Sequence, residues 1–486
     1  MSYDYIIVGA GPVGLTLAWL FSHRHQNKKI VVIDREDDIG GCHRVRRYQG
    51  LFTEHGPRIY SNIYLNMTQI LGDMGIPFDQ IFTPYNFSSG SISSDILTKL
   101  SIREITLLGI EYFKLIFNPI YGQTTAVADF LQAHNFSAES RDLLNRVCRL
   151  TDGAGIDRYT MFELLSGFDQ HVFYSFMQPR QPNDRGLFAI WRTKLKSIGV
   201  DFMLNTTVNK VNYDHTHPGH VLGVNIQSGN GSHDLLAPNV ILALPPNPVA
   251  KILRGLTWNG IDLTRFGQAS QYAINIPIVF HWNKKLILPK VWGFPSTDWG
   301  VVSILLSDYT HFDEPQSQTV ITTCITLTDT PSSKTRKTAN QTADKNTLID
   351  EVFRQLSDVY GGLPTPTAAI LSPEMYRGGD EKWQSTDTAF VLTPAGGFIR
   401  EQRNKEIKGL YWVGTHNGNS YYHFTSMESA VTNALAFYIK YGGNGGGMYQ
   451  LHKPLNLSKI LRYVIAVIVV LFGIWIYHGR IATNFS

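Results

Sequence analysis

The sequence predicts an α/β protein: a domain built on a parallel sheet, a smaller α+β domain interleaved with it, and a C-terminal transmembrane helix. Three observations predict this fold. A short apolar run near the start leads into a glycine-rich turn. A second apolar run ends in an acidic residue. Close to the other end of the chain, the stretch Tyr463–Tyr477 is apolar and carries no charge.

The first element is a buried parallel strand with a tight turn after it. Tyr5–Val8 is short and apolar, as expected for a strand that is covered on both faces. The turn follows the pattern G-x-G-x-x-G through Gly9, Gly11 and Gly14. Gly9 allows the bend, Gly11 has no side chain to block a pyrophosphate, and Gly14 lets the next helix pack closely on the strand.

A helix and a second strand complete this motif. The helix, from Val13 to about His23, directs its N-terminal amides and the positive end of its dipole at the phosphates. The second strand, Lys29–Ile33, is followed by Asp34. This acid lies close to the spacing of roughly 20 residues expected for a carboxylate that binds a ribose. The complete order predicts a dinucleotide site rather than a glycine-rich turn without a ligand.

Composition narrows the class of partner. The 486 residues are enough for two or more structural units with a large core. A net charge of +4 without a basic stripe argues against nucleic acid, so we expect a small-molecule substrate. The three cysteines Cys42, Cys148 and Cys324 are too widely spaced for a disulfide framework, and no metal site is expected.

Several segments resemble the flavin amine oxidase and desaturase superfamily, which includes monoamine oxidase, protoporphyrinogen oxidase and phytoene desaturase. A second glycine pair, Gly40-Gly41, follows Asp34. The internal strand set is similar at 205–211, 221–226 and 239–246, and the closing motif is similar at Gly409–Thr415 and Ser426–Val431. The resemblance implies a discontinuous Rossmann-like FAD-binding domain. It also implies that the helix near Met427 points its amides at the flavin, where they stabilise negative charge.

The resemblance also implies which residues hold the cofactor. We expect FAD to contact Gly9, Gly11, Pro12, Val13, Gly14, Asp34, Arg35, Gly40, Gly41, Gly56, Pro57, Arg58, Val208, Gly414, Thr415, Met427 and Glu428.

The remaining organisation is read from composition and periodicity. The FAD-binding domain is expected to consist of residues 1–65, 185–255 and 385–440, and the substrate domain of residues 66–184 and 256–384. Residues 101–118 predict an amphipathic helix that lines a pocket, touches a membrane or simply packs in the core. Residues 269–281 and 319–327 predict strands, and 329–346 an exposed loop.

Two segments carry the expectations about the substrate site. Phe52–Tyr60 falls where the chain of the family passes the flavin, and it is similar to a Gly-Pro-His stretch of UDP-galactopyranose mutase, with Arg58 at the histidine position. Arg58 stabilises reduced flavin, binds an anionic substrate or forms a structural ion pair. Within 416–425, Tyr422 and His423 are candidates to shape the pocket or carry protons.

Three differences from the monoamine oxidase pattern narrow the range of reactions that we expect. The stretch Ala389–Gly409 contains no cysteine to link the flavin, so we expect non-covalent FAD. The strand-like stretch Tyr272–Phe280 lacks the lysine that amine oxidases place near the flavin, and Ser426 replaces a tyrosine. The prediction is an FAD-dependent oxidoreductase that takes a hydride from a small or lipophilic substrate. The alternatives are a flavin-dependent isomerase resembling UDP-galactopyranose mutase and a tethered flavoprotein without turnover.

The C-terminal stretch predicts a single membrane anchor. Tyr463–Tyr477 lies between Arg462 and Arg480 and, with the residues before it, gives a span of about 460–478. Trp475 suits the membrane interface. The other interpretation is a buried core helix, but a glycine-rich stretch within 441–459 reads as a flexible linker. Because no signal peptide precedes the first strand, we expect the catalytic body on the cytosolic side. No feature indicates the oligomeric state.

Overall fold

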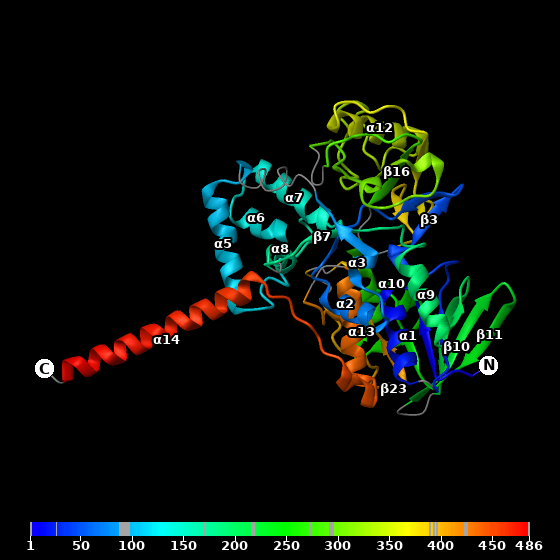
Figure 1. The fold of residues 1–486 in the computed structure, drawn as a ribbon, viewed down its shortest axis with the longest axis horizontal. Coiled ribbons are helices and arrows are strands. Elements are labelled where there is room, and N and C mark those ends of the chain that lie inside the picture. Colours follow the sequence, from blue (N-terminus) through cyan, green and yellow to red (C-terminus); the bar gives the residue numbers. More distant parts are fainter. Residues whose placement is uncertain are drawn as a thin grey trace.

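The computed structural model describes residues 2–25, 27–86, 98–169, 172–214, 219–269, 271–272, 275–290, 296–387, 390–391, 394, 397–421 and 426–484. It shows a mixed α/β body from which one long C-terminal helix, α14 (Leu457–Asn484), projects away (Figure 1).

A five-stranded parallel sheet forms the lower half of the body. Its order is β24-β12-β1-β2-β8, so strands from three distant parts of the chain lie side by side. The strands are β1 (Tyr5–Val8), β2 (Ile30–Ile33), β8 (Asp201–Met203), β12 (Val240–Leu242) and β24 (Leu410–Trp412). Their apolar side chains are almost completely buried, as the short apolar runs predict.

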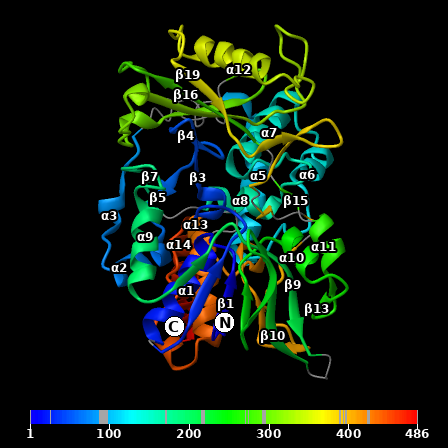
Figure 2. The same ribbon diagram turned by 90° about the vertical axis from the view of Figure 1, so that its right-hand side faces the viewer.

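Helices cover one face of this sheet. Helix α1 (Pro12–Arg24) packs against α13 (Met427–Tyr441) and α9 (Leu187–Ser197). The other face packs on a second sheet, β11-β10-β23 with β9 paired to β10 (Figure 2). Its strands and the helices beside it are β9 (Thr207–Tyr213), β10 (Gly219–Ser228), β11 (Gly231–Leu236), β23 (Ile407–Lys408), α10 (Pro246–Ile252) and α11 (Leu263–Ala269).

The upper half of the body contains an antiparallel sheet of order β17-β18-β16-β19. Its strands are β16 (Ile276–Trp282), β17 (Val301–Leu305), β18 (Thr319–Ile325) and β19 (Ala368–Leu371), and α12 (Lys345–Val359) packs on them. The predicted strands at 269–281 and 319–327 are therefore confirmed in their main parts. Helix α12 begins where Asp344 accepts a hydrogen bond from the backbone amide of Thr347.

A helical cluster lies beside that sheet. Its members are α5 (Ile102–Phe117), α6 (Val127–Ala133), α7 (Ala138–Asp152) and α8 (Met161–Phe168). The predicted helix at 101–118 is confirmed as α5. Reciprocal capping boxes start two of the helices: Ser101 with Glu104 in α5, and Thr160 with Glu163 in α8.

Short elements connect these layers. They are β3 (Val45–Tyr48), β4 (Leu51–Glu54), β5 (Tyr60–Ser61), α2 (Leu65–Asp73), α3 (Phe78–Ile81), β6 (Phe82–Pro84), β7 (Phe176–Pro179), β13 (Thr257–Trp258), β14 (Ile261–Asp262), β15 (Gln271–Tyr272), β20 (Met375–Arg377), β21 (Trp383–Ser385) and β22 (Phe390–Val391), with 3-10 turns η1 (Gly41–His43), η2 (Leu306–Asp308), η3 (Pro315–Ser317), η4 (Thr415–Asn417) and η5 (Gly443–Met448).

The predicted linker joins α13 to α14. Its glycine run forms the 3-10 turn η5, and the chain after it is held against the body. The Tyr449 hydroxyl donates to Asp73 at 2.6 Å, and the backbone amide of His452 donates to the side chain of Asn66 at 2.8 Å. The linker thus lies against the body through contacts with residues more than 370 positions away in the sequence.

Helix α14 carries the predicted span. Its part Leu457–Ile476 contains an apolar window with a mean hydropathy of 2.2, and no residue of that window is buried against the body. By length and composition, this part is apolar enough to cross a membrane.

Candidate functional site

Two cavities meet at the centre of the body. The larger has a volume of about 1040 Å³ and lies along the carboxyl ends of the parallel strands. The smaller has a volume of about 380 Å³ and lies between that sheet, the helical cluster and the antiparallel sheet. Cys42, His43 and Ser426 line both, so a ligand in the first cavity borders a ligand in the second.

The glycine turn forms the floor of the first cavity, and each glycine serves a distinct purpose. Gly9 has a φ of +110°, and a Cβ there would lie 2.5 Å from the carbonyl oxygen of Ala243. A Cβ on Gly14 would lie 1.9 Å from the carbonyl oxygen of Gly9. A Cβ on Gly11 would meet only the backbone of Gly41, at 3.6 Å. The fold requires glycine at positions 9 and 14, whereas Gly11 leaves room for a ligand.

Asp34 stands at the end of β2, where the sequence predicts a ribose-binding acid. One carboxylate oxygen accepts from the backbone amide of Ala10 at 2.7 Å, and the other accepts from that of Glu36 at 3.0 Å. The carboxylate therefore holds the glycine turn in place. Because each carboxylate oxygen accepts more than one hydrogen bond, capacity remains for a ligand hydroxyl.

The start of α1 and a buried arginine give this cavity a positive end. No side chain caps α1, and its first turn contains no acidic residue. Arg44, only 2% exposed, lines the cavity. Its guanidinium lies 3.7 Å from Asp34 and 3.5 Å from Asp387, distances longer than a tight ion pair. Uncapped helix amides beside a buried cation are suited to an anionic group such as a pyrophosphate.

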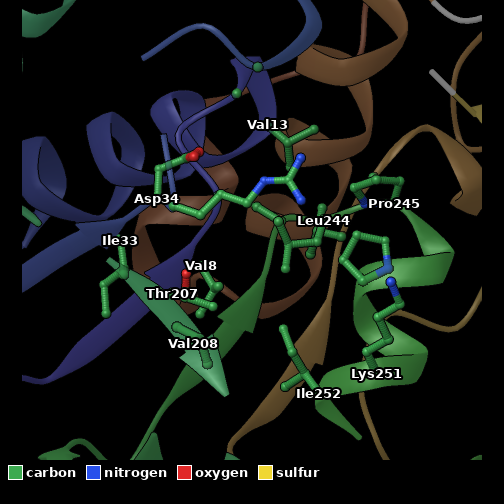
Figure 3. A pocket seen from close by; sticks show the side chains of 18 of the residues that line it. Val8, Val13, Ile33, Asp34, Thr207, Val208, Leu244, Pro245, Lys251 and Ile252 are labelled. Carbon is green, nitrogen blue, oxygen red and sulfur yellow. The ribbon is translucent and has the colours of Figure 1, made fainter. Parts of the chain in front are cut away.

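The far wall of the first cavity is apolar. Figure 3 shows Val8, Val13, Val208, Leu244 and Ile252 around a common space, with Asp34 at its edge. Lys251 of α10 lies at the rim beside Pro245 (Figure 3). A flat apolar ring system fits between such walls.

The closing motif borders both cavities. Gly414 and Thr415 line the first cavity, and Met427 lines the second. Ser426 caps α13 by accepting from the backbone amide of Ser429 at 3.0 Å. Glu428, unlike Gly414, Thr415 and Met427, lines neither cavity. It is buried and points to α2, where it accepts hydrogen bonds from Asn66 and Met67.

Arg58 stands where the cavities meet. Its guanidinium donates to His43 Nδ1 at 3.2 Å and to the carbonyl oxygen of Cys42. Burial, together with the positive charge of Arg58, lowers the pKa of His43 well below 6.5. Because a protonated Nδ1 would repel the guanidinium, His43 is neutral and accepts through Nδ1. The junction therefore carries one fixed positive charge beside a neutral imidazole.

Residues from five separate parts of the chain line the second cavity. Beyond those already named, they include His55, Gly56, Pro57, Tyr60, Tyr64, Arg149, Tyr159, Glu163, Phe168, Tyr174, Asn275, Val302, Cys324 and Thr326. Arg149 donates to the carbonyl oxygen of Thr326 at 3.1 Å. Its buried Nε has no hydrogen-bond partner, and burial lowers the pKa of its guanidinium. The cavity is thus mostly apolar with a few polar groups inside it.

The structure distributes the predicted site residues over this arrangement. The first cavity is lined by Gly9, Gly11, Pro12, Val13, Asp34, Arg35, Gly41, Val208, Gly414 and Thr415, and the second by Gly56, Pro57, Arg58 and Met427. Gly14 and Gly40 shape the backbone instead: a Cβ on Gly40 would lie 2.8 Å from the ring of Phe188. Tyr422 and His423 lie outside the described residues.

Other lining residues were not expected from the sequence. Arg44 and Asp387 reach the first cavity from segments more than 300 residues apart, and Arg149 and Thr326 reach the second from a helix and a strand end. For Arg44, its position shortly after Gly40-Gly41 is a local signal that it lies near the turn. No local signal exists for the others.

The comparisons with known proteins agree with this geometry. A family model described as flavin containing amine oxidoreductase matches residues 14–436. A putrescine oxidase double mutant superposes with a TM-score of 0.63 at 14% identity, covering 89% of this chain and 97% of that one. A putative protoporphyrinogen oxidase from Exiguobacterium sp. gives 0.57 at 16% identity, covering 89% and 97%. An oxidoreductase from Methanosarcina mazei gives 0.57 at 12%, covering 89% and 99%. No protein matched in a search of curated proteins.

Proposed function

Because the chain belongs to the family of flavin-containing amine oxidoreductases, which are FAD-dependent enzymes, we propose that it oxidises a small or lipophilic substrate in the second cavity with FAD in the first. The observation that carries this proposal is the junction of the two cavities. A cofactor that fills the first cavity would present one edge at Cys42, His43 and Ser426, where a substrate in the second cavity meets it.

The residues of the first cavity fit FAD. Gly11 leaves a space that a side chain would fill, and the uncapped start of α1 lies beside the buried cation Arg44. These features suit the pyrophosphate. Asp34 has acceptor capacity for a ribose hydroxyl, and the wall around Val208 suits the adenine. The remaining contacts are assigned to Gly9, Pro12, Val13, Arg35, Gly41, Gly414 and Thr415.

FAD supplies the redox chemistry by accepting a hydride equivalent from the substrate. The chain's own groups then have three tasks. The apolar walls of the second cavity orient the substrate and exclude water. Arg58 places a positive charge at the junction, which stabilises negative charge that develops on either ligand. His43, neutral and held through Nδ1, presents Nε2–H as a hydrogen-bond donor on its other side.

Two other functions rest on specific features. The segment Gly56-Pro57-Arg58, which lines the second cavity, supports a flavin-dependent isomerase similar to UDP-galactopyranose mutase. The described part of 272–280 contains no lysine, which supports a reaction other than amine oxidation. A flavoprotein that only binds its ligand, without turnover, would be consistent with the same feature.

Stopped-flow absorbance of the full-length protein in detergent separates these functions. Loss of the oxidised flavin absorbance on mixing with a panel of monoamines, polyamines and lipophilic reductants, without oxygen, is the result expected of an oxidoreductase. Turnover of a sugar nucleotide only after chemical reduction, with no net loss of electrons, would instead establish the isomerase. No response to any compound would favour the binding role.

The first prediction concerns how the cofactor is held. None of the three cysteines lies within Ala389–Gly409, so we expect FAD to be non-covalent. Acid precipitation of the yellow full-length protein should leave the flavin in the supernatant, where its fluorescence and mass identify it. Flavin that stays with the pellet and gives a flavinylated peptide would contradict this prediction, and Cys42, which lines both cavities, is the residue to inspect.

The second prediction concerns Arg58. Removing its charge with Arg58→Met should lower the midpoint potential of the bound flavin by about 30 mV, which corresponds to about 1.4 kcal/mol for a two-electron couple. Arg58→Lys should restore most of the potential because it keeps the charge. Spectroelectrochemical titration measures the change. Arg158→Met is the matched control, since that side chain is 53% exposed and lines neither cavity. Equal potentials in all four proteins would show that Arg58 is only structural.

The location of the enzyme is also part of the proposal. The apolar window within Leu457–Ile476 of α14, which the body does not bury, supports a single C-terminal membrane anchor, with the body on the cytosolic side. The division into an FAD-binding domain and a substrate domain at the predicted boundaries is supported by the parallel sheet, whose strands come from residues 5–33, 201–242 and 410–412.

A further inference from the structure

Helix α5 buries two glutamates and exposes large apolar side chains, which is unusual for a surface helix. Its acidic residues Glu104 and Glu111 face inward and are buried. Glu104 accepts from the backbone amides of Ser101 and Ser137, both at 2.8 Å, and its carboxylate has a pKa of about 2 because these hydrogen bonds outweigh burial. The outward face is apolar instead: Phe113 is 53% exposed. A soluble helix shows the reverse pattern.

The outward face is broad and continuous. At 3.6 residues per turn, the exposed apolar residues of α5 lie on one side of the helix. Further exposed apolar side chains lie just after α5, at and after the end of α8, and around the start of α14. Together we name these residues the apolar collar: Ile102, Ile105, Ile110, Phe113, Phe117, Ile120, Phe168, Val172, Phe173, Tyr174, Leu455 and Leu457. Monomeric soluble proteins seldom expose so many large apolar side chains in neighbouring segments.

The collar surrounds the root of α14 because Asp169 ties these segments together. One oxygen of Asp169 accepts from the hydroxyl of Tyr112 in α5 at 2.8 Å and from the backbone amide of Ser458 at 2.8 Å. The other accepts from Asn456 at 2.7 Å. The backbone amide of Val172 donates to the carbonyl oxygen of Leu455 at 3.1 Å. The first turn of α14 is therefore fixed to α5 and to the end of α8.

The direction of α14 sets the orientation of the collar. In Figure 1, α14 leaves the body beside one end of α5 and runs outward, while α5 runs across that direction along the same edge of the body. If α14 crosses a bilayer, α5 lies along its surface, on the side of the body from which the span leaves. An amphipathic helix in that position buries its apolar face between the headgroups and the acyl chains.

Basic residues border the collar. Arg103 and Lys114 are exposed and follow the apolar face of α5 along one edge, and Lys453, Lys459 and Arg462 flank the first turns of α14. Cations in such positions lie at the level of the phosphates, and each attracts anionic lipid.

We propose that the apolar collar is a second membrane contact, in which the outward face of α5 lies in the interface of the bilayer that α14 spans. The occupant is a lipid bilayer rather than a protein partner because the collar surrounds the root of α14, whose apolar window beyond the first turn is not buried by the body. The proposal rests on the membrane anchor of the proposed function and adds a contact that a simple tether does not need.

The collar also reaches the substrate side. Phe168 and Tyr174, each 45% exposed, belong to the collar and line the second cavity. The second cavity therefore approaches the surface within the membrane contact. A substrate dissolved in the bilayer would enter there without crossing water. Of the small or lipophilic substrates proposed above, this route favours a lipophilic one.

Site-directed spin labelling of the full-length protein tests the collar. Phe113→Cys places the label on the collar, Val467→Cys in the middle of the span, and Asp350→Cys on the exposed side of α12 in the upper half of the body. Each protein is reconstituted into vesicles of phosphatidylcholine and phosphatidylserine. Electron paramagnetic resonance then compares accessibility to oxygen, which concentrates in hydrocarbon, with accessibility to a nickel chelate, which stays in water. The unmutated chain gives the background from the native cysteines, of which Cys148 and Cys324 are buried.

The expected result is an oxygen-to-nickel ratio at Phe113 and Val467 that is several-fold higher than at Asp350. A high ratio at Val467 with a ratio at Phe113 equal to that at Asp350 would overturn the collar and leave the anchor standing. A low ratio at Val467 would overturn the anchor and the collar together. A strongly immobilised label at position 113 with low accessibility to both reagents would indicate a protein partner instead and would also overturn the proposal.

Discussion

Gly11→Val is expected to give a folded protein that contains no FAD. In the structure, a Cβ on Gly11 meets only the Cα and the amide nitrogen of Gly41, at 3.6 and 3.9 Å, which is ordinary contact. The fold therefore tolerates the first carbon of a side chain. The methyl groups of valine would extend into the space beside the start of α1, where the pyrophosphate is assigned. Visible absorbance per protein should fall to background, while circular dichroism stays unchanged.

Two further variants isolate the cause. Gly72→Val introduces the same side chain at an exposed position of α2 with nothing within 4 Å, so its flavin content should equal that of the unmutated protein. Gly14→Ala should fail to fold, since its Cβ would lie 1.9 Å from the carbonyl oxygen of Gly9. Normal flavin content in Gly11→Val would show that the turn does not approach the pyrophosphate.

The contrast between Gly11 and Gly14 explains what the sequence predicts well. The turn, Asp34 and the strand containing Val208 depend on the local requirements of a backbone that bends sharply beside a ligand. Neighbouring residues meet those requirements, so sequence pattern and spacing are sufficient to predict these elements. The same holds for α5, whose length and capping box follow from Ser101 to Phe117.

Tertiary packing decides the rest. The periodicity of α5 indicates an apolar face but not that this face is exposed. The inward position of Glu104 depends on donors from another segment, Ser137 and Ser140, which the sequence of α5 does not reveal. Arg149 and Thr326 meet in the second cavity although they are 177 positions apart. Such contacts are properties of the assembled fold, and single-sequence patterns contain no information about them.

The side chain of Glu428 makes a tertiary contact that the sequence pattern does not reveal, and this contact leads to the second large effect. Helix α2 begins after Tyr64 without a side-chain cap of its own. Glu428 of α13 supplies that cap: it accepts from the backbone amides of Asn66 and Met67, each at 2.9 Å, and from the side chain of Asn66 at 2.8 Å. The carboxylate thus joins two helices through donors that are buried with it.

Glu428→Ala should lower the stability of the full-length protein by about 3–5 kcal/mol, because three buried donors lose their acceptor at once. The apparent melting temperature in detergent measures this loss. Glu406→Gln, at an exposed position, is the control for removal of a carboxylate and should change the melting temperature little.

The pH dependence separates the charge of Glu428 from its hydrogen bonds. Burial raises the pKa of this carboxyl to about 7, and the hydrogen bonds from Asn66 and Met67 act in the opposite direction. Since the folded pKa lies above the usual value of 4.5, the folded state binds the extra proton. The resulting stability is complete below about pH 4.5 and is lost as the pH rises through about 7. Glu428→Gln, which does not titrate, should therefore gain about 2–3 kcal/mol relative to the unmutated protein between pH 5 and pH 8. A difference in melting temperature between these two proteins that stays constant over this range would show that the carboxyl is ionised throughout, held by its three donors alone.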